Sequence, residues 1–322
     1  MTYKDFEKER VEALMKDTLM GQVFDTVMKT RVEHDFHGYF DFSYNKNICY
    51  SSDYGGENNQ SQYNVYTFTF FSYSSLELWQ NELDNLRLQK GYNKPAEYKM
   101  IDPNSRKGKL RDWLELSEKY FKGMVVSFAI DKKLDSLFAP TKDILHEQIS
   151  LQAHFSDCNL SPNVLEKAFR ISNFSNLILS QVLGDGYGFW WMSDRDAIAN
   201  GKERWQFTVK LHGHILRHYC EHLTDVQPGY SLPFTKEERT HFSEDFLSLS
   251  DLFSGAMDDF CNHFQGKTSQ ELSATLKPKS IEILSYLKKL PTFIYVLDTD
   301  GTNSKCRRVV INIVEDDEGK ME

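Results

Sequence analysis

The sequence predicts an α/β domain built on a mixed sheet flanked by helices. Short runs of aromatic and β-branched residues alternate with longer amphipathic segments along most of the chain. Aromatic residues make up 14% of the sequence, and much of that excess falls in the short runs, which is typical of buried strands. The 322 residues contain no convincing linker, so one domain with terminal additions is expected.

Residues 3 to about 30 place apolar side chains near helical spacing among charges, which predicts an amphipathic helix. We expect this helix to form an extension over residues 1–35, in front of a main domain over residues 36–266. The tail, residues 267–322, is expected to add a helix and a β-hairpin packed on the same domain.

The main domain is predicted to begin with a hairpin, after short aromatic alternation that leads to a turn at residues 45–47. Residues 48–53 form a predicted strand that ends at Asp53, and residues 63–71 have the strongest strand pattern of the chain. A helix is then predicted to begin at Ser74, where Glu77 completes capping-box spacing, and to end at Gly91.

Predicted helices and strands alternate through the middle of the chain. A helix through Trp113 precedes a strand over residues 123–130, which is an unbroken apolar run. Ser161-Pro162 opens the next helix, because proline is favoured at a first helical position. A strand over residues 187–194 follows and ends in the carboxylate of Asp194.

The remaining elements are predicted from the same patterns. Helices are expected over about residues 204–223, from Thr235 through Met257, and over residues 280–290. A terminal hairpin should pair residues 293–297 with residues 309–314 and turn at Asp300-Gly301.

Charge and cysteine content limit the function. The formal charge of −9 repels polyanions, which weakens any mode of nucleic-acid binding through bulk charge but permits a local patch with bound cations. The five cysteines are scattered and form no C-x-x-C pair. The N-terminus is charged, and no apolar run reaches the roughly 20 residues that span a bilayer. A reduced, cytoplasmic protein without membrane contact is expected.

Four acidic residues stand where an α/β sheet would gather them. Asp53 and Asp194 end predicted strands, Glu97 follows a helix, and Asp251 lies inside one. Ligands bind at the carboxyl ends of strands, so Asp53 and Asp194 share a site if their strands are neighbours. A cluster of such like charges is stable only with bound cations. Oxygen ligands favour Mg²⁺ or Mn²⁺, and two such ions can stabilise the attacking and leaving oxygens when a phosphodiester is cleaved.

The helix around Asp251 carries small residues one turn later, at Ser254 and Gly255. We expect both to let the helix pack closely against the sheet and to bring Asp251 to the metal. An acid flanked by Leu249, Leu252 and Phe253 is hard to explain unless it faces a cleft.

The order of these motifs resembles the ribonuclease H-like superfamily. The motifs are a strand-end Asp, Glu97-Tyr98-Lys99, a second strand-end Asp, and a Ser-Asp-Leu-x-x-Gly-Ala helix. More narrowly, the chain is similar over residues 46 to 264 to a widespread bacterial family of unknown function within that superfamily. The resemblance implies a site of metal ligands in the order Asp53, Glu97, Asp194 or Asp196, and Asp251.

The sequence departs from the family pattern after its first Asp. Tyr54-Gly55-Gly56 follows Asp53, so it stays open whether Glu57 replaces the acid that usually adjoins it. The carboxylates also have ordinary structural interpretations. Asp53 is suited to start a turn, Glu97 to pair with Lys99, and Asp194 or Asp196 to cap the next helix.

Basic residues near these motifs are candidates for substrate binding. Beside Lys99, one compact patch contains Arg106, Lys107, Lys109 and Arg111, and a second contains Arg195, Lys202, Arg204 and Lys210. They would contact phosphates next to the carboxylates. Solvated loop or helix faces are the commoner explanation of such runs.

A group of histidines is an alternative candidate site. His214, His218 and His222 would share one helix face at metal-ligand spacing, which raises zinc binding or a His general base. No H-E-x-x-H or paired Cys accompanies them, so a polar face is favoured over zinc. The chain also lacks a Walker loop, a G-x-G-x-x-G fingerprint and a G-x-S-x-G elbow.

Two functions remain. The first is a Mg²⁺- or Mn²⁺-dependent nuclease acting on DNA or RNA, which the family analogy associates with bacterial defence or mobile elements. The second is a catalytically inactive interaction protein, in which an eroded site and exposed aromatic residues bind a protein partner or a second copy of the chain.

Overall fold

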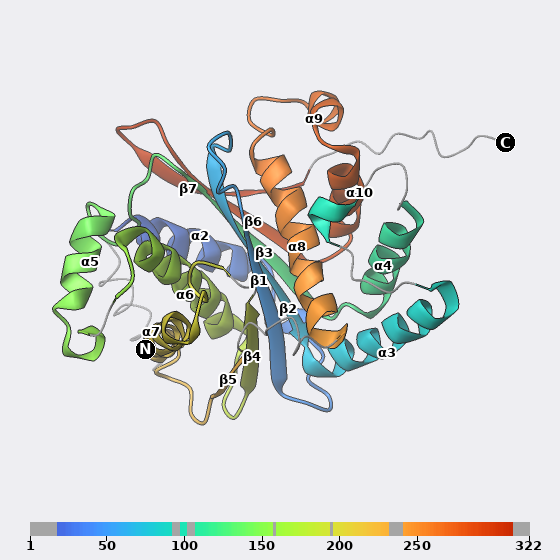
Figure 1. Ribbon diagram of the computed structural model, residues 1–322, viewed down its shortest axis with the longest axis horizontal. Coiled ribbons are helices and arrows are strands. Elements are labelled where there is room, and N and C mark those ends of the chain that lie inside the picture. The colour runs from blue at the N-terminus through green and yellow to red at the C-terminus, as the bar shows by residue number, and fades with distance from the viewer. Residues whose placement is uncertain are drawn as a thin grey trace.

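The computed structural model describes most of the chain. The described ranges are residues 18–91, 97–101, 107–156, 159–193, 196–231 and 241–311, without the side chains of residues 107–109 and 241. Within them a seven-stranded mixed sheet is flanked by helices on both faces (Figure 1). The α/β class predicted from the sequence is therefore confirmed.

An antiparallel meander forms the middle of the sheet. β1 (Asn47–Gly55), β2 (Tyr63–Ser72) and β3 (Gly123–Asp131) are neighbours in that order. On the other side of β1, β4 (Gly188–Ser193) pairs in parallel, and β5 (Gln227–Ser231) extends the sheet in the same direction. β1 is thus hydrogen-bonded along both of its edges.

The opposite end of the sheet is the C-terminal hairpin. β6 (Thr292–Thr299) pairs in parallel with β3, and β7 (Ser304–Val309) pairs antiparallel with β6. The second strand was predicted at residues 309–314, so the prediction was wrong and placed it later in the chain than β7 lies. The turn is tight because the Asp300 carboxylate accepts the backbone N–H groups of Thr302 and Asn303 at 2.8 and 2.7 Å. Residues beyond 311 lie outside the described part.

The helices separate into two layers (Figure 1). One face of the sheet carries α2 (Leu19–Glu33), α5 (Lys142–Ser150), α6 (Pro162–Val182) and α7 (Lys202–Tyr219). The other face carries α3 (Tyr73–Lys90), α4 (Lys107–Tyr120), α8 (His241–Cys261), α9 (Ser269–Thr275) and α10 (Pro278–Leu287). Short 3₁₀ turns are η1 (His37–Tyr39), η2 (Tyr98–Met100) and η3 (Ala153–Phe155).

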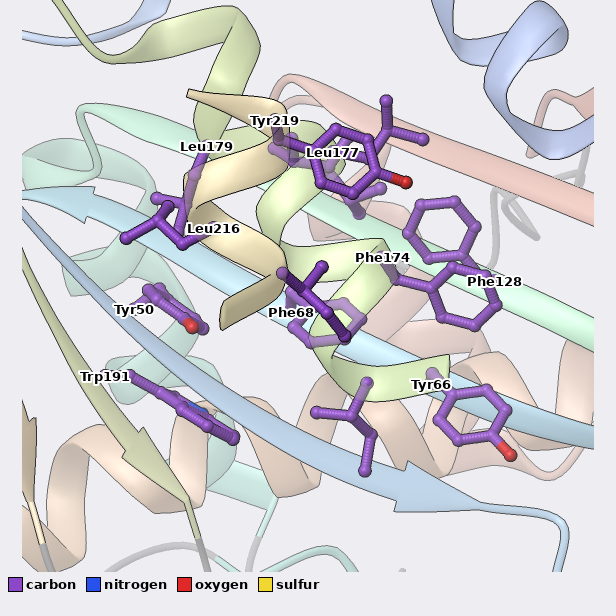
Figure 2. Close-up of a cluster of buried hydrophobic side chains, with 14 of the residues drawn as sticks. Tyr50, Tyr66, Phe68, Phe128, Phe174, Leu177, Leu179, Trp191, Leu216 and Tyr219 are labelled. Atoms are coloured by element: carbon purple, nitrogen blue, oxygen red, sulfur yellow. The ribbon is translucent and has the colours of Figure 1, made fainter. Parts of the chain in front are cut away.

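Aromatic side chains fill the layer between the sheet and α6 (Figure 2). Phe128 of β3 stacks on Phe174 of α6 with ring centroids 4.2 Å apart, and Tyr50 stacks on Trp191 at 5.9 Å. Such pairs contribute beyond the area they bury. The aromatic excess of the composition is therefore core, as the strand patterns predicted.

Helix boundaries agree with the sequence patterns at some ends and differ at others. α6 starts with Pro162 after Ser161, and α3 ends at Gly91, whose φ of 69° is the left-handed conformation that glycine favours. α3 already begins at Tyr73, however, so Ser74 is inside the helix and Ser72 is the N-cap. The expected capping box at Ser74 is wrong.

The N-terminal helix is shorter in the described residues than the predicted one. α2 spans Leu19–Glu33, and residues 1–17 lie outside the described part. Met20 and Val27 of α2 are fully buried in the same core as the sheet. None of the helices among the described residues combines the length and the apolar character needed to cross a bilayer.

Candidate carboxylate site

β1 presents two different faces. Ser51 hydrogen-bonds the hydroxyl of Ser250 and the carbonyl of Phe246 on α8, the latter at 3.2 Å. Gly55 also faces α8, because a side-chain carbon there would lie 3.4 Å from the Ser254 hydroxyl. Since side chains alternate along a strand, Asp53 points to the α8 side between these two contacts.

Asp53 lies near the end of β1 and not at its last position. It pairs with Thr67 of β2, and the pairing continues to Gly55 opposite Val65, so the strand runs two residues further than expected. The side chain of Asp53 is half-buried. The hairpin therefore holds this carboxylate on a paired strand, close to the carboxyl edge of the sheet.

The condition for a shared site, that the strands of Asp53 and Asp194 are neighbours, is met. β4 lies parallel to β1, with Ser193 opposite Ser52. Asp194 is the next residue in the chain, but Asp194 and Arg195 lie outside the described residues.

Asp251 contacts the residue that follows Glu97 in the chain. The N–H of Tyr98 donates to Oδ2 of Asp251 at 2.5 Å, and Glu97 is the N-cap of the same 3₁₀ turn. Glu97 itself is exposed. Asp251 thus holds the turn that carries Glu97 against α8.

Tyr98 fixes this turn to two helices. Its hydroxyl lies 2.6 Å from that of Ser280 on α10, and Lys279 donates to its backbone carbonyl at 2.7 Å. The Lys279 ammonium also lies 4.1 Å from the centre of the Tyr98 ring. Such a cation–π contact adds to the stability of the position.

The two small residues of α8 have separate roles. Ser254 faces the sheet at Gly55, as expected. A side-chain carbon at Gly255 would overlap the Tyr98 ring, so Gly255 makes room for that ring and not for the sheet. The expectation that both residues serve the sheet contact is correct only for Ser254.

Asp258 was not singled out from the sequence. It follows Asp251 by two helical turns. Ser61 of the β1–β2 connection donates to its carboxylate at 3.4 Å, and Asn262, just after the end of α8, donates to it at 2.7 Å. Burial raises the pKa of Asp258, against the lowering effect of Lys277. The i+7 spacing from Asp251 on the same helix is a signal that sequence reasoning could have used.

Asp196 and Glu57 share one lysine. The Lys167 ammonium lies 2.5 Å from Asp196 Oδ2 and also pairs with Glu57. The same ammonium sits 4.7 Å from the ring centre of Tyr54, which alternates with Asp53 and so points to the α6 side. Both acids therefore pair with a single cation of α6.

The fit of a hard cation can be tested on the donors present. Carboxylates of Asp53, Glu97 and Asp251 are the oxygen ligands that Mg²⁺ and Mn²⁺ prefer. The hydroxyl of Ser254, fully buried on the face of α8 that meets Gly55, has no hydrogen-bond partner in the part of the chain that is described. Across the described ranges, however, no three His, Cys, Asp or Glu residues lie close enough to hold a metal. The donor types fit, but the described carboxylates do not form a three-ligand group.

Several of the predicted basic residues have no described side chain, so their place relative to this site stays a prediction. Lys99 is exposed in η2 next to Glu97. Arg106 lies outside the described part, and the side chains of Lys107 and Lys109 are not described. In the second patch, Lys210 on α7 lies over Phe155, on the other side of the sheet.

The histidine face is shorter than expected. α7 ends at Tyr219, so His222 is beyond the helix and the i, i+4, i+8 arrangement does not form. Nε2 of His214 and Nε2 of His218 lie 3.3 Å apart. His212 is fully buried instead, between the hydroxyls of Tyr50 at 2.9 Å and Tyr230 at 3.1 Å, and burial lowers its pKa to about 3.

Comparison with known protein families finds no matching family model, and comparison with curated proteins finds no match either.

Proposed function

We propose that this protein is a ribonuclease H-like nuclease that hydrolyses phosphodiester bonds of DNA or RNA with Mg²⁺ or Mn²⁺. The observation that carries the proposal is the bond from the Tyr98 N–H to Asp251, which places Glu97 beside α8. The face of β1 that carries Asp53 meets the same stretch of α8.

The sheet topology supports the proposal. The resemblance implies a mixed sheet whose first strand and a later strand both end in a carboxylate. Here β1 and β4 are parallel neighbours, and Asp194 comes directly after β4 in the chain. Ligands of open α/β sheets bind at this carboxyl edge.

Each described residue would have a distinct part in the reaction. Asp53, Glu97 and Asp251 would hold the cations, with Asp194 as the fourth ligand. When bound, the cations supply a water of lowered pKa and stabilise the charge of the phosphodiester transition state. The Tyr98 N–H fixes the orientation of the Asp251 carboxylate, and Lys99 would contact the substrate backbone.

The test is cleavage of single- and double-stranded DNA and RNA with Mn²⁺. Asp53→Asn and Asp251→Asn should each lower the cleavage rate at least about 100-fold, because removal of a catalytic charge costs several kcal/mol of transition-state stabilisation. Asp25→Asn, an exposed position on α2, is the matched control and should cleave normally. Full activity in both site variants would refute the assignment.

The second function is an inactive interaction protein with the same fold. Two observations favour it: Lys167 neutralises Glu57 and Asp196, and the described residues contain no three-ligand group. Exposed large aromatic residues in the described part are Tyr44 and Tyr73. Mn²⁺ should raise the melting temperature of the nuclease and not that of its Asp251→Asn variant. An unchanged melting temperature in the wild type would favour the inactive protein.

A further inference from the structure

A cavity lies on the opposite side of the sheet from Asp251. It has a volume of about 700 Å³ and is enclosed by α7, η3 and the segment that leads into β5. Small-molecule sites in proteins have volumes of about 300–1,000 Å³. The cavity is therefore large enough for a metabolite-sized ligand.

Basic side chains outnumber acidic ones in the lining of this cavity. His154 comes from η3, and Lys210, His214 and Arg217 come from α7. Asp225 is the one carboxylate among the lining residues. In a chain with a formal charge of −9, this is a local reversal of sign. Such a concentration of positive charge attracts anions.

The histidines are held close together at the cavity. The ring centroids of His214 and His218 lie 4.9 Å apart, and that of His154 lies 6.2 Å from His214. Burial lowers the pKa of His214, and His218, His154 and Arg217 lower it further. These surroundings therefore disfavour the charged form of His214, which a bound anion would stabilise.

The rest of the wall is apolar or aromatic. Val209, Leu216 and Val226 line it together with Phe155 and Tyr230. Lys210 lies 5.5 Å above the Phe155 ring, and the Tyr230 hydroxyl is held by the buried His212 at 3.1 Å. One part of the cavity thus suits an anionic group and another a flat, apolar body.

We propose that this cavity binds a small organic phosphate of the nucleoside monophosphate class. The phosphate contacts Lys210, His214 and Arg217, with His154 beside them, and the base or sugar lies against the apolar wall. A dianion matches several cationic groups better than a single carboxylate does. The site is independent of the carboxylate site, because the sheet separates α7 from α8 (Figure 1).

Binding is expected to be stronger at lower pH. A bound phosphate favours the charged form of His214, so binding takes up a proton and affinity rises as the pH falls from 8 to 6. The other groups around His214 are His154, Lys210, Arg217 and His218, with Asp225, Cys220 and Tyr230 also at the cavity.

Calorimetric titration of the full chain with adenosine monophosphate tests the proposal, with inorganic phosphate and adenosine as comparison ligands. The monophosphate should bind most tightly, phosphate more weakly, and adenosine weakest. Arg217→Gln and Lys210→Gln should each weaken binding about tenfold, which is the loss of one charge-assisted contact. Lys29→Gln, at an exposed position of α2, should bind as the wild type does.

Three results would overturn the proposal. They are equal binding of adenosine and its monophosphate, unchanged binding in Arg217→Gln with a normal melting temperature, and stabilisation by Zn²⁺ without any phosphate binding. Asp251→Asn should keep full affinity for the monophosphate, so failure of the nuclease proposal and failure of this one are distinguishable.

Discussion

The two faces of β1 differ in kind. Towards α6 and α7 it presents Tyr50 and Tyr54, within a core of aromatic rings. Towards α8 it presents Ser51, Asp53 and Gly55, two of which have small side chains or none. One face gains stability from aromatic packing, while the other lets a helix approach closely and keeps an acid at its end. The contrast shows that one strand can serve the core and a polar site at once.

Two of the buried titratable groups, one on each side of the sheet, have opposite consequences for stability. Burial lowers the pKa of His212 on the α7 side to about 3. Burial raises the pKa of Asp245 on α8 to about 6, although Arg87 and Gln80 donate to its carboxylate. These two groups therefore test the comparison directly.

The largest expected effect is the pH dependence of the free energy of unfolding. Unfolded His212 binds a proton below about pH 6.5 and folded His212 does not, so stability falls by about 1.4 kcal/mol per pH unit from 6.5 towards 3. For Asp245 the folded pKa is the higher one, so its contribution is present below about pH 4 and is lost as the pH rises to about 6.

Urea unfolding of His212→Gln and Asp245→Asn between pH 4 and 7 measures both slopes. The wild type should lose stability relative to His212→Gln as the pH falls, and relative to Asp245→Asn as the pH rises. The difference in unfolding free energy between the wild type and each variant should change with pH in opposite directions. A change in the same direction for both variants would contradict the opposite effects of His212 and Asp245.

The next effect compares two glycines inside helices. Gly255→Ala on α8 should destabilise the protein by about 2–3 kcal/mol, because the new carbon displaces the Tyr98 ring. Gly213→Ala on α7 should be neutral or stabilising by about 0.5–1 kcal/mol, because the carbon meets only the Tyr230 hydroxyl, at 3.6 Å. Thermal melts rank the two variants, and equal stability would mean that the Tyr98 contact is loose.

The smallest effect concerns two lysine ion pairs. Lys167→Met should cost about 1–2 kcal/mol, because the partly buried ammonium joins α6 to Glu57 and Asp196. Lys90→Met removes an exposed pair with Asp112 and should cost under about 1 kcal/mol. Chemical denaturation of both variants at low and high salt measures the two losses of stability. A larger loss in Lys90→Met than in Lys167→Met would contradict the prediction.

Apolar patterns predicted the central elements, because burial depends on local composition. The unbroken run at residues 123–130 is β3, and Pro162 opens α6. β5 was missed because Gln227-Pro228-Gly229 has low strand propensity, which only an edge position tolerates. α5 and α9 were missed too, although Thr141 and Thr268 cap them, because both are short and polar.

The candidate site could be predicted only in part. The acids at the ends of two strands could be recognised from the sequence, but the parallel pairing of β1 and β4, which is a long-range contact, was only a condition for a shared site. The role of Tyr98 could not be predicted, because its contacts to Asp251 and Ser280 join segments more than 150 residues apart in the chain. Lys167 likewise carries no local signal that it would neutralise Asp196.

The central position of β1 has a consequence for synthesis on the ribosome. β1, β2 and β3 are consecutive and can pair as soon as they emerge, but β4 begins only at Gly188 and β6 at Thr292. Until then, both outer strands of the nascent meander have open hydrogen-bonding edges beside strongly aromatic faces. Such edges are templates for intermolecular pairing, so the growing chain has its greatest need of chaperones in this interval.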